Sequence, residues 1–96
     1  MEILDLLANK ELGAKQKTEA LADALLTKKL GVNELVKLTQ PLKDPLKATC
    51  MEAFEYATQL NTELATPALW QLATESLAAK APRLKWESAK VIAHIA

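Results

Sequence analysis

The sequence predicts an all-α protein. Ala and Leu supply 17 and 18 of the 96 residues, and together with Glu, Lys and Arg they account for 56. These are the strongest helix-forming residues, and a share of about half or more is typical of packed helices. Only six residues are Val or Ile and four are aromatic, so the residue types that favour β-strands are scarce.

Three helices are predicted in the first half of the chain. They cover residues 2–8, residues 14–29, and a segment that Asn33 caps and that ends before Pro41. Gly31 is expected to close the second helix as a C-cap with positive φ. Apolar residues at helical spacing predict the buried faces of these helices: Ile3, Leu4, Leu6, Leu7, Ala14, Leu21, Ala22, Leu25, Leu35, Val36 and Leu38.

Three more helices are predicted in the second half. The pairs Asp44-Pro45 and Thr66-Pro67 each place a side-chain acceptor before a proline, which is a strong start signal. They predict helices over about 45–60 and 67–79, and Pro82 opens the last one. The predicted inward residues of the fourth and sixth helices are Leu46, Cys50, Ala53, Phe54, Ala57, Leu84, Ser88, Ala89, Val91, Ile92 and Ile95.

The helix pattern repeats along the chain. A shift of 32 residues superposes the apolar pattern of residues 3–6 on that of 35–38, and a shift of 34 carries the latter onto residues 69–72. Such a period predicts three stacked helix pairs, a right-handed α-α superhelix or solenoid. We expect a single domain over residues 1–96, with repeats at about 1–31, 32–61 and 62–96.

Two stretches resemble HEAT-like repeats of the HEAT/armadillo type. Residues 82–95 combine a turn proline, an aliphatic residue, a basic residue, small residues and a paired apolar step. The segment Asp44-Pro45-Leu46-Lys47, followed by Cys50, Ala53 and Phe54, has the same pattern. The first repeat departs from it, since Gly13 stands where the others have proline. The resemblance implies a solenoid whose second helices line a concave surface, which such families mostly use to hold proteins or peptides.

The sequence offers little catalytic chemistry. It has one cysteine, Cys50, and one histidine, His94, so a metal cage built from several histidines cannot form within one chain. Cys50 is expected to be a small core residue and His94 a structural or solvated one. We therefore predict a protein that is not an enzyme and that uses no cofactor or metal.

The charges are balanced overall but unevenly distributed. Twelve basic and twelve acidic residues give a net charge of zero, which disfavours nucleic-acid binding. Residues 48–79 hold four acids and no base, whereas residues 80–90 hold four bases and one acid. We expect Glu52 and Glu55 to face Lys85 or Lys90 across neighbouring second helices.

Two features have both a structural and a functional interpretation. Lys15, Lys47 and Lys85 recur at one repeat position, the last step being a shift of 38 residues because the first helix of the third pair is one turn longer. Bracing between repeats or simple solvation is favoured over a basic stripe for an acidic ligand. Trp70 is expected to pack between first helices. Trp86 is expected to pack in the core or between repeats, with an exposed anchor for a partner as the alternative.

The predicted function is a non-enzymatic protein- or peptide-binding scaffold. Its concave face would present Lys47, Glu52, Glu55, Lys85, Trp86, Lys90 and His94. The alternatives are a nucleic-acid-binding or DNA-glycosylase-like HEAT protein, a bilin-lyase-like enzyme, and a self-associating structural module. The last is motivated by the apolar pattern up to Ala96, which we expect further repeats or a second copy to cover at the C-terminal helix edge.

A cytoplasmic location without membrane contact is expected. No apolar run approaches the roughly 18 residues that span a bilayer. Acidic Glu2 and Asp5 stand where a signal peptide carries bases. A single cysteine is also typical of a reducing compartment.

Overall fold

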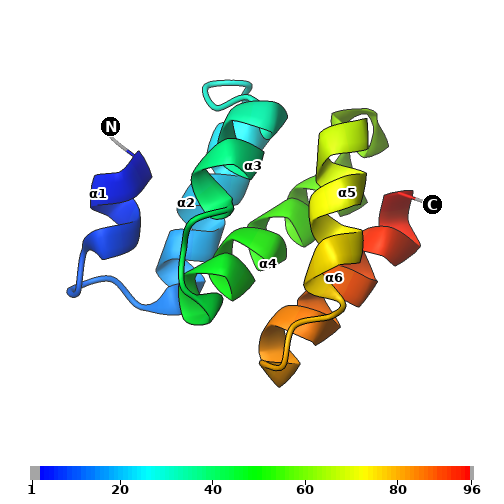
Figure 1. Ribbon diagram of the computed structural model, residues 1–96. Coiled ribbons are helices and arrows are strands. Elements are labelled where there is room, and N and C mark those ends of the chain that lie inside the picture. The colour runs from blue at the N-terminus through cyan, green and yellow to red at the C-terminus, as the bar shows by residue number, and fades with distance from the viewer. Residues whose placement is uncertain (1–2, 96) are drawn as a thin grey trace.

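The computed structural model describes residues 3–95, and these form helices without any strand. The elements are α1 (Ile3–Ala8), α2 (Ala14–Leu26), α3 (Val32–Thr39), α4 (Asp44–Leu60), the 3₁₀ helix η1 (Thr62–Leu64), α5 (Pro67–Ser76) and α6 (Pro82–Ile95). Figure 1 shows α1 at one end of the molecule and α6 at the other. The predicted all-α fold with six α-helices is confirmed. The predicted start at residue 2 and the chain end at Ala96 lie outside the described residues.

The proline-marked starts are close to where the sequence places them. The hydroxyl of Thr66 accepts a hydrogen bond from the Leu69 amide at 3.2 Å, so this residue is the predicted N-cap of α5. In α4, Lys43 occupies the N-cap and Asp44 is the first helical residue. A carboxylate in the first turn still interacts favourably with the positive end of the helix dipole.

The prediction for the turn between α2 and α3 is wrong. Gly31 has φ −73° and is the N-cap of α3, which begins before Asn33. The residue with positive φ is Lys28, at 64°. This left-handed turn ends α2 at Leu26, three residues earlier than expected, and lets the Leu30 amide donate to the Ala24 carbonyl at 3.1 Å. The turn thereby directs the Leu30 side chain toward the core, where it is buried.

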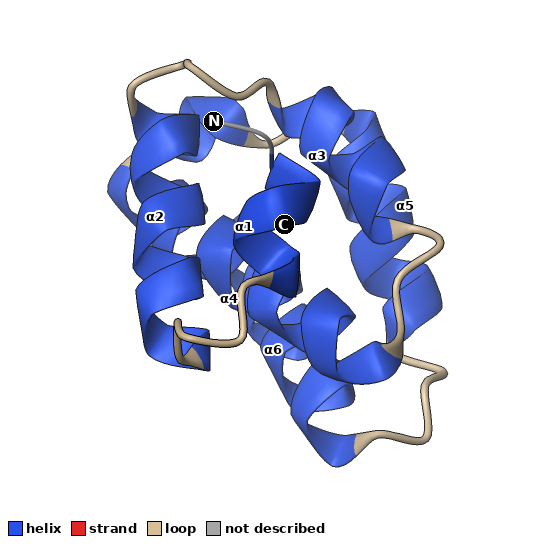
Figure 2. Ribbon diagram, turned by 90° about the vertical axis from the view of Figure 1, so that its left-hand side faces the viewer, coloured by secondary structure: helices blue, strands red, loops and turns tan. Residues whose placement is uncertain are grey.

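α4 is the central helix of the fold. It packs against α2 on one flank and against α6 on the other, while α3 packs against α5. Seen from the α1 end in Figure 2, α2 lies on one side of the molecule and α3 and α5 lie on the other. α1 contacts α2, and the Lys17 ammonium fixes its last turn by donating to the Leu7 carbonyl at 2.7 Å.

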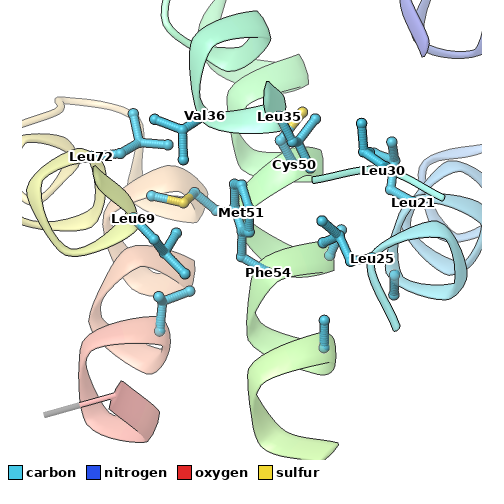
Figure 3. Close-up of a cluster of buried hydrophobic side chains, with 14 of the residues drawn as sticks. Leu21, Leu25, Leu30, Leu35, Val36, Cys50, Met51, Phe54, Leu69 and Leu72 are labelled. Carbon is cyan, nitrogen blue, oxygen red and sulfur yellow. The ribbon is translucent and has the colours of Figure 1, made fainter. Parts of the chain in front are cut away.

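The core lies where these helices meet. Met51 and Phe54 project from α4 and are fully buried. Figure 3 shows them between leucine and valine side chains of α2, α3 and α5. The neighbours labelled there are Leu21, Leu25, Leu30, Leu35, Val36, Cys50, Leu69 and Leu72. One continuous apolar cluster therefore joins α2, α3, α4 and α5.

Several residues expected inside lie at the surface. Leu4 is 51% exposed because Leu6 and Leu7 occupy the inner side of the short helix α1. Ala14 and Ala89 are exposed as well. Trp70 is 43% exposed rather than packed between first helices, because the inner side of α5 is formed by Leu69, Leu72 and Ala73.

The apolar end of α6 contributes to the chain's own core. Val91 is fully buried, and Ile92 and Ile95 pack against the core cluster while remaining partly accessible. The exposed side of this helix instead carries Ala89 and Ala93. In residues 3–95, no helix combines the length and the apolar character that crossing a bilayer requires.

Candidate functional site

A charged cluster lies between α4 and α6. Glu52 and Glu55 of α4 are three residues apart and so lie on neighbouring turns of one side. On α6, steps of four, three and four residues place four polar side chains in one stripe. We call the six residues the α4–α6 cluster: Glu52, Glu55, Arg83, Glu87, Lys90 and His94. The two sets meet because α6 packs against α4.

Two contacts join the helices directly. The Arg83 guanidinium lies 3.0 Å from the Glu52 carboxylate, and His94 Nε2 lies 3.1 Å from Glu55 Oε1. The second contact is an ion pair only when the imidazole is protonated. Because Arg83 and His94 are eleven residues apart, the contacts hold α6 to α4 near both of its ends. Glu52 and Glu55 are only partly exposed, which agrees with a role between the helices.

Glu87 is the buried member of the cluster, with 6% of its surface exposed. Burial raises the pKa of its carboxyl, and the hydrogen bond and negative charge of the neighbouring Glu52 raise it further, against the opposing charge of Lys90. Burial also acts to raise the pKa of Glu52, but the hydrogen bond with Glu87 and the positive charges of Arg83 and Lys90 lower it overall. The two pKa shifts therefore have opposite directions, as expected for neighbouring carboxyls that differ in burial and in contact with cations.

Lys90 connects this cluster to an exposed aromatic residue. Its ammonium lies 3.3 Å from Glu87 Oε1, although that oxygen has no hydrogen-bond partner within the described part of the chain. The same ammonium lies 4.6 Å from the ring centroid of Trp86, four residues earlier, in a cation–π contact. Trp86 is 67% exposed. The interpretation of Trp86 as a packed core residue is therefore wrong, and the alternative of an exposed aromatic is confirmed.

The structure gathers five of the seven predicted site residues: Glu52, Glu55, Trp86, Lys90 and His94. Lys85 is exposed and lies on another side of α6 from the cluster. It is two residues from both Arg83 and Glu87, and two residues correspond to about 200° around a helix. Lys47 is half-buried and lines a separate cavity of about 580 Å³ with Gln40, Asp44 and Glu75. Within residues 3–95, neither Lys47 nor Lys85 forms an ion pair.

The predicted charge complementarity between the helices exists, but the ion pairs join other residues. Glu52 pairs with Arg83 and Glu55 with His94, whereas Lys90 pairs with Glu87 and acts on Glu52 only through its charge. Arg83 and Glu87 were not among the site residues predicted from the sequence. Their spacing with Lys90 and His94 was the available signal, because residues 83, 87, 90 and 94 follow a single helical stripe.

A groove on the other flank of α4 was not predicted from the sequence either. We call it the α2–α4 groove. Its volume is about 300 Å³; α2 contributes Lys15, Thr18, Glu19, Ala22, Asp23 and Leu26, and α4 contributes Tyr56. Tyr56 is 47% exposed and stands one turn after Glu52, so α4 connects the groove to the α4–α6 cluster.

The single thiol is a core group. Cys50 is fully inaccessible, and burial raises its pKa although a hydrogen bond with Thr39 acts to lower it. Nucleophilic cysteines need a depressed pKa and access, so the prediction of a small core residue is confirmed. Within the described residues, no group of three or more His, Cys, Asp or Glu side chains is arranged to hold a metal ion.

Comparisons with protein-family models, curated proteins and solved structures found no match.

Proposed function

We propose that this chain is a non-enzymatic module that binds a protein or peptide on the surface formed by α2, α4 and α6. The proposed arrangement is a short HEAT-like solenoid of three helix pairs, with α2, α4 and α6 as the second helices of the pairs. It is supported by the consecutive packing of α2, α4 and α6 and by the contact between α3 and α5. In such arrays, each repeat packs only on its neighbours, and the second helices form an extended binding surface.

The observation that carries this proposal is the environment of Trp86. Most of this large aromatic side chain is exposed, yet Lys90 holds its ring from one face. Exposed tryptophans are frequent anchors of protein interfaces. A ring that is already oriented loses less conformational entropy when a partner packs against it.

The α4–α6 cluster has a supporting role in this proposal. Glu52 and Glu55 are occupied by Arg83 and His94, so their carboxylates fix the angle of α6 rather than contact the partner. The direct contacts are assigned to Trp86 and Lys90 and, on the other flank of α4, to the α2–α4 groove beside Tyr56. A partner that spans α4 would bury both aromatic side chains.

A matched set of variants tests the proposal. Peptides selected from a displayed random library on the immobilised protein are expected to lose about tenfold in affinity on Trp86→Ala and several-fold on Tyr56→Ala. Trp70→Ala, which removes an exposed tryptophan of α5, is the control and should leave affinity unchanged. Circular dichroism melts establish that each variant folds. Peptides that bind Trp86→Ala as tightly as the wild type would contradict the proposed surface.

Nucleic-acid binding is disfavoured by the charge pairing. Arg83 and Lys90, about one turn before and after Trp86 on α6, each lie beside a carboxylate, Glu52 and Glu87 respectively. A general nucleic-acid binder needs basic groups free to neutralise phosphates. An electrophoretic shift with duplex DNA or single-stranded RNA at 50–150 mM salt is expected to be absent, and a shift that salt weakens steeply would overturn this view.

A further inference from the structure

Thr18 differs from the other threonines within the α-helices. The hydroxyls of those residues donate to the carbonyl four residues earlier, at 2.7–3.1 Å: Thr39 to Leu35, Thr49 to Pro45, Thr58 to Phe54 and Thr74 to Trp70. Thr18 is fully buried, but its Oγ1 has no hydrogen-bond partner in residues 3–95. A buried hydroxyl without a partner costs free energy. Thr18 is one of the residues that line the α2–α4 groove, and a group bound against it there would supply the missing partner.

The groove also carries acceptors for a cation. Glu19 and Asp23 are both exposed, and since they are four residues apart they lie on one side of α2. No ion pair engages either carboxylate within the described chain. Lys15 precedes Glu19 by one turn, and a lysine placed N-terminal to a glutamate is the less favourable order on a helix. Both carboxylates are therefore available to a ligand.

Apart from Lys15, the rest of the groove is largely apolar. Ala22 and Leu26 line it from α2, and the Tyr56 ring closes it from α4. A lysine side chain matches this combination, because its four methylenes are apolar and its ammonium has three N–H donors. Glu19, Asp23 and the Thr18 hydroxyl offer three acceptors, and an aromatic ring adds a favourable face for a cation.

We propose that the α2–α4 groove binds a lysine side chain of the partner polypeptide. The methylenes pack on Ala22, Leu26 and the Tyr56 ring, and the ammonium binds Glu19, Asp23 and the Thr18 hydroxyl. This inference rests on the proposed function, since it assigns one side chain of the partner to a defined part of the α2, α4 and α6 surface.

Single-residue probes test the groove separately from Trp86. Nα-acetyl-lysine amide, with its ε-ammonium free, is titrated into ¹⁵N-labelled protein and followed by amide chemical shifts. We expect shifts concentrated in residues 15–26 and at Tyr56. Nα-acetyl-norleucine amide, which has an apolar side chain without the ammonium, should bind about tenfold more weakly. Nα-acetyl-arginine amide should also bind more weakly, because its planar fork does not match three separate acceptors.

Amino-acid substitutions in the groove test which side chains bind the lysine ammonium. Glu19→Gln combined with Asp23→Asn should abolish the preference for lysine over norleucine. Asp5→Asn combined with Glu34→Gln removes the same two charges at exposed positions outside the groove and should preserve it. Thr18→Val, of nearly the same shape, should weaken lysine binding about threefold without lowering the melting temperature, because the hydroxyl has no partner in the free protein.

Three results would overturn the inference. They are equal binding of lysine and norleucine, lysine-induced shifts that lie outside the groove, and a lysine preference that survives loss of both carboxylates. None of them would affect the Trp86 surface, because these probes are too small to span α4. If the probes behave as expected but library peptides ignore Trp86→Ala, the groove stands and the wider proposed function fails.

Discussion

Glu52 on α4 and Glu87 on α6 are neighbouring carboxyls that shift each other's pKa in opposite directions, lowering that of Glu52 and raising that of Glu87. Two like-charged groups at one helix interface repel each other when both are ionised. Arg83, 3.0 Å from Glu52, and Lys90, 3.3 Å from Glu87, offset that repulsion from the solvent side. The contact between α4 and α6 is therefore sensitive to pH and to loss of either cation.

Replacing Glu87 by glutamine should stabilise the protein at neutral pH. Burial and Glu52 raise the pKa of Glu87 above its ordinary value near 4.5. At pH values between the ordinary and the raised pKa, the folded protein therefore keeps a proton on Glu87 that the unfolded chain has released. Stability consequently falls as pH rises through that range. The glutamine amide would keep the hydrogen bond to Glu52 without the charge. We expect Glu87→Gln to raise Tm by about 3 °C at pH 7.5.

This gain should shrink as the pH is lowered to about 4, where the wild-type Glu87 is itself protonated. Glu52 gives the opposite pH dependence of stability in the wild type and in Glu87→Gln. Its pKa is lowered in the folded state, so its contribution to the free energy of unfolding is lost as the pH falls below the ordinary pKa of 4.5. Thermal melts from pH 3 to 8 measure both effects. A Glu87→Gln protein that is equally destabilised at every pH would show that the Lys90 contact outweighs the repulsion.

Removal of Arg83 should loosen α6. Arg83→Gln leaves the Glu52 carboxylate beside Glu87 without its nearest cation. Because Arg83 is partly exposed, we expect a loss of at most about 1 kcal/mol, or about 5 °C in Tm. Lys85→Gln removes an exposed charge from the same helix and is the matched control, with an expected change under about 2 °C. Equal effects of the two substitutions would contradict a specific role for Arg83.

Salt distinguishes the mechanism of this loss. The difference between the wild type and Arg83→Gln should decrease between 0.05 and about 1 M NaCl, because the Debye length falls to roughly 3 Å at the higher concentration. A difference that is independent of salt would indicate lost packing of the arginine methylenes instead.

Phe54 should be the most sensitive core position. It is fully buried at the meeting point of α2, α3, α4 and α5, so Phe54→Ala leaves a cavity and is expected to cost about 3–5 kcal/mol. That is a large part of the stability of a small domain. Leu60→Ala, at an exposed position of the same helix, should change the free energy of unfolding by less than about 0.5 kcal/mol. Urea denaturation followed by circular dichroism measures both.

Cys50 should resist thiol reagents in the native protein. Its sulfur is inaccessible, and burial raises its pKa and so disfavours the reactive thiolate. Reaction with a chromogenic disulfide reagent at pH 8 should proceed only as fast as the fold opens, and it should be complete within seconds in 6 M urea. Rapid labelling without denaturant would show that α3 and α4 separate readily.

The helices themselves were predictable because their signals are local. Thr66-Pro67 and Pro82 mark helix starts through one side-chain acceptor or one restricted backbone angle, which requires no knowledge of the rest of the chain. Turns are less predictable. The left-handed residue is Lys28 rather than Gly31 because Leu30 must enter the core, and burial of a leucine outweighs the backbone cost at a lysine.

The amino-acid sequence alone determined that the chain is helical, where most helices begin, and that Glu52, Glu55, Lys90 and His94 belong to facing helices. The tertiary structure decided their partners, because the crossing of α4 and α6 brings Arg83 and His94, and not Lys85, to the two glutamates. It also decided that Trp86 faces solvent and that, among residues 3–95, the buried Thr18 hydroxyl finds no hydrogen-bond partner. Helical periodicity specifies which residues share a side of one helix, but the angle and offset between two helices depend on side-chain packing throughout the core.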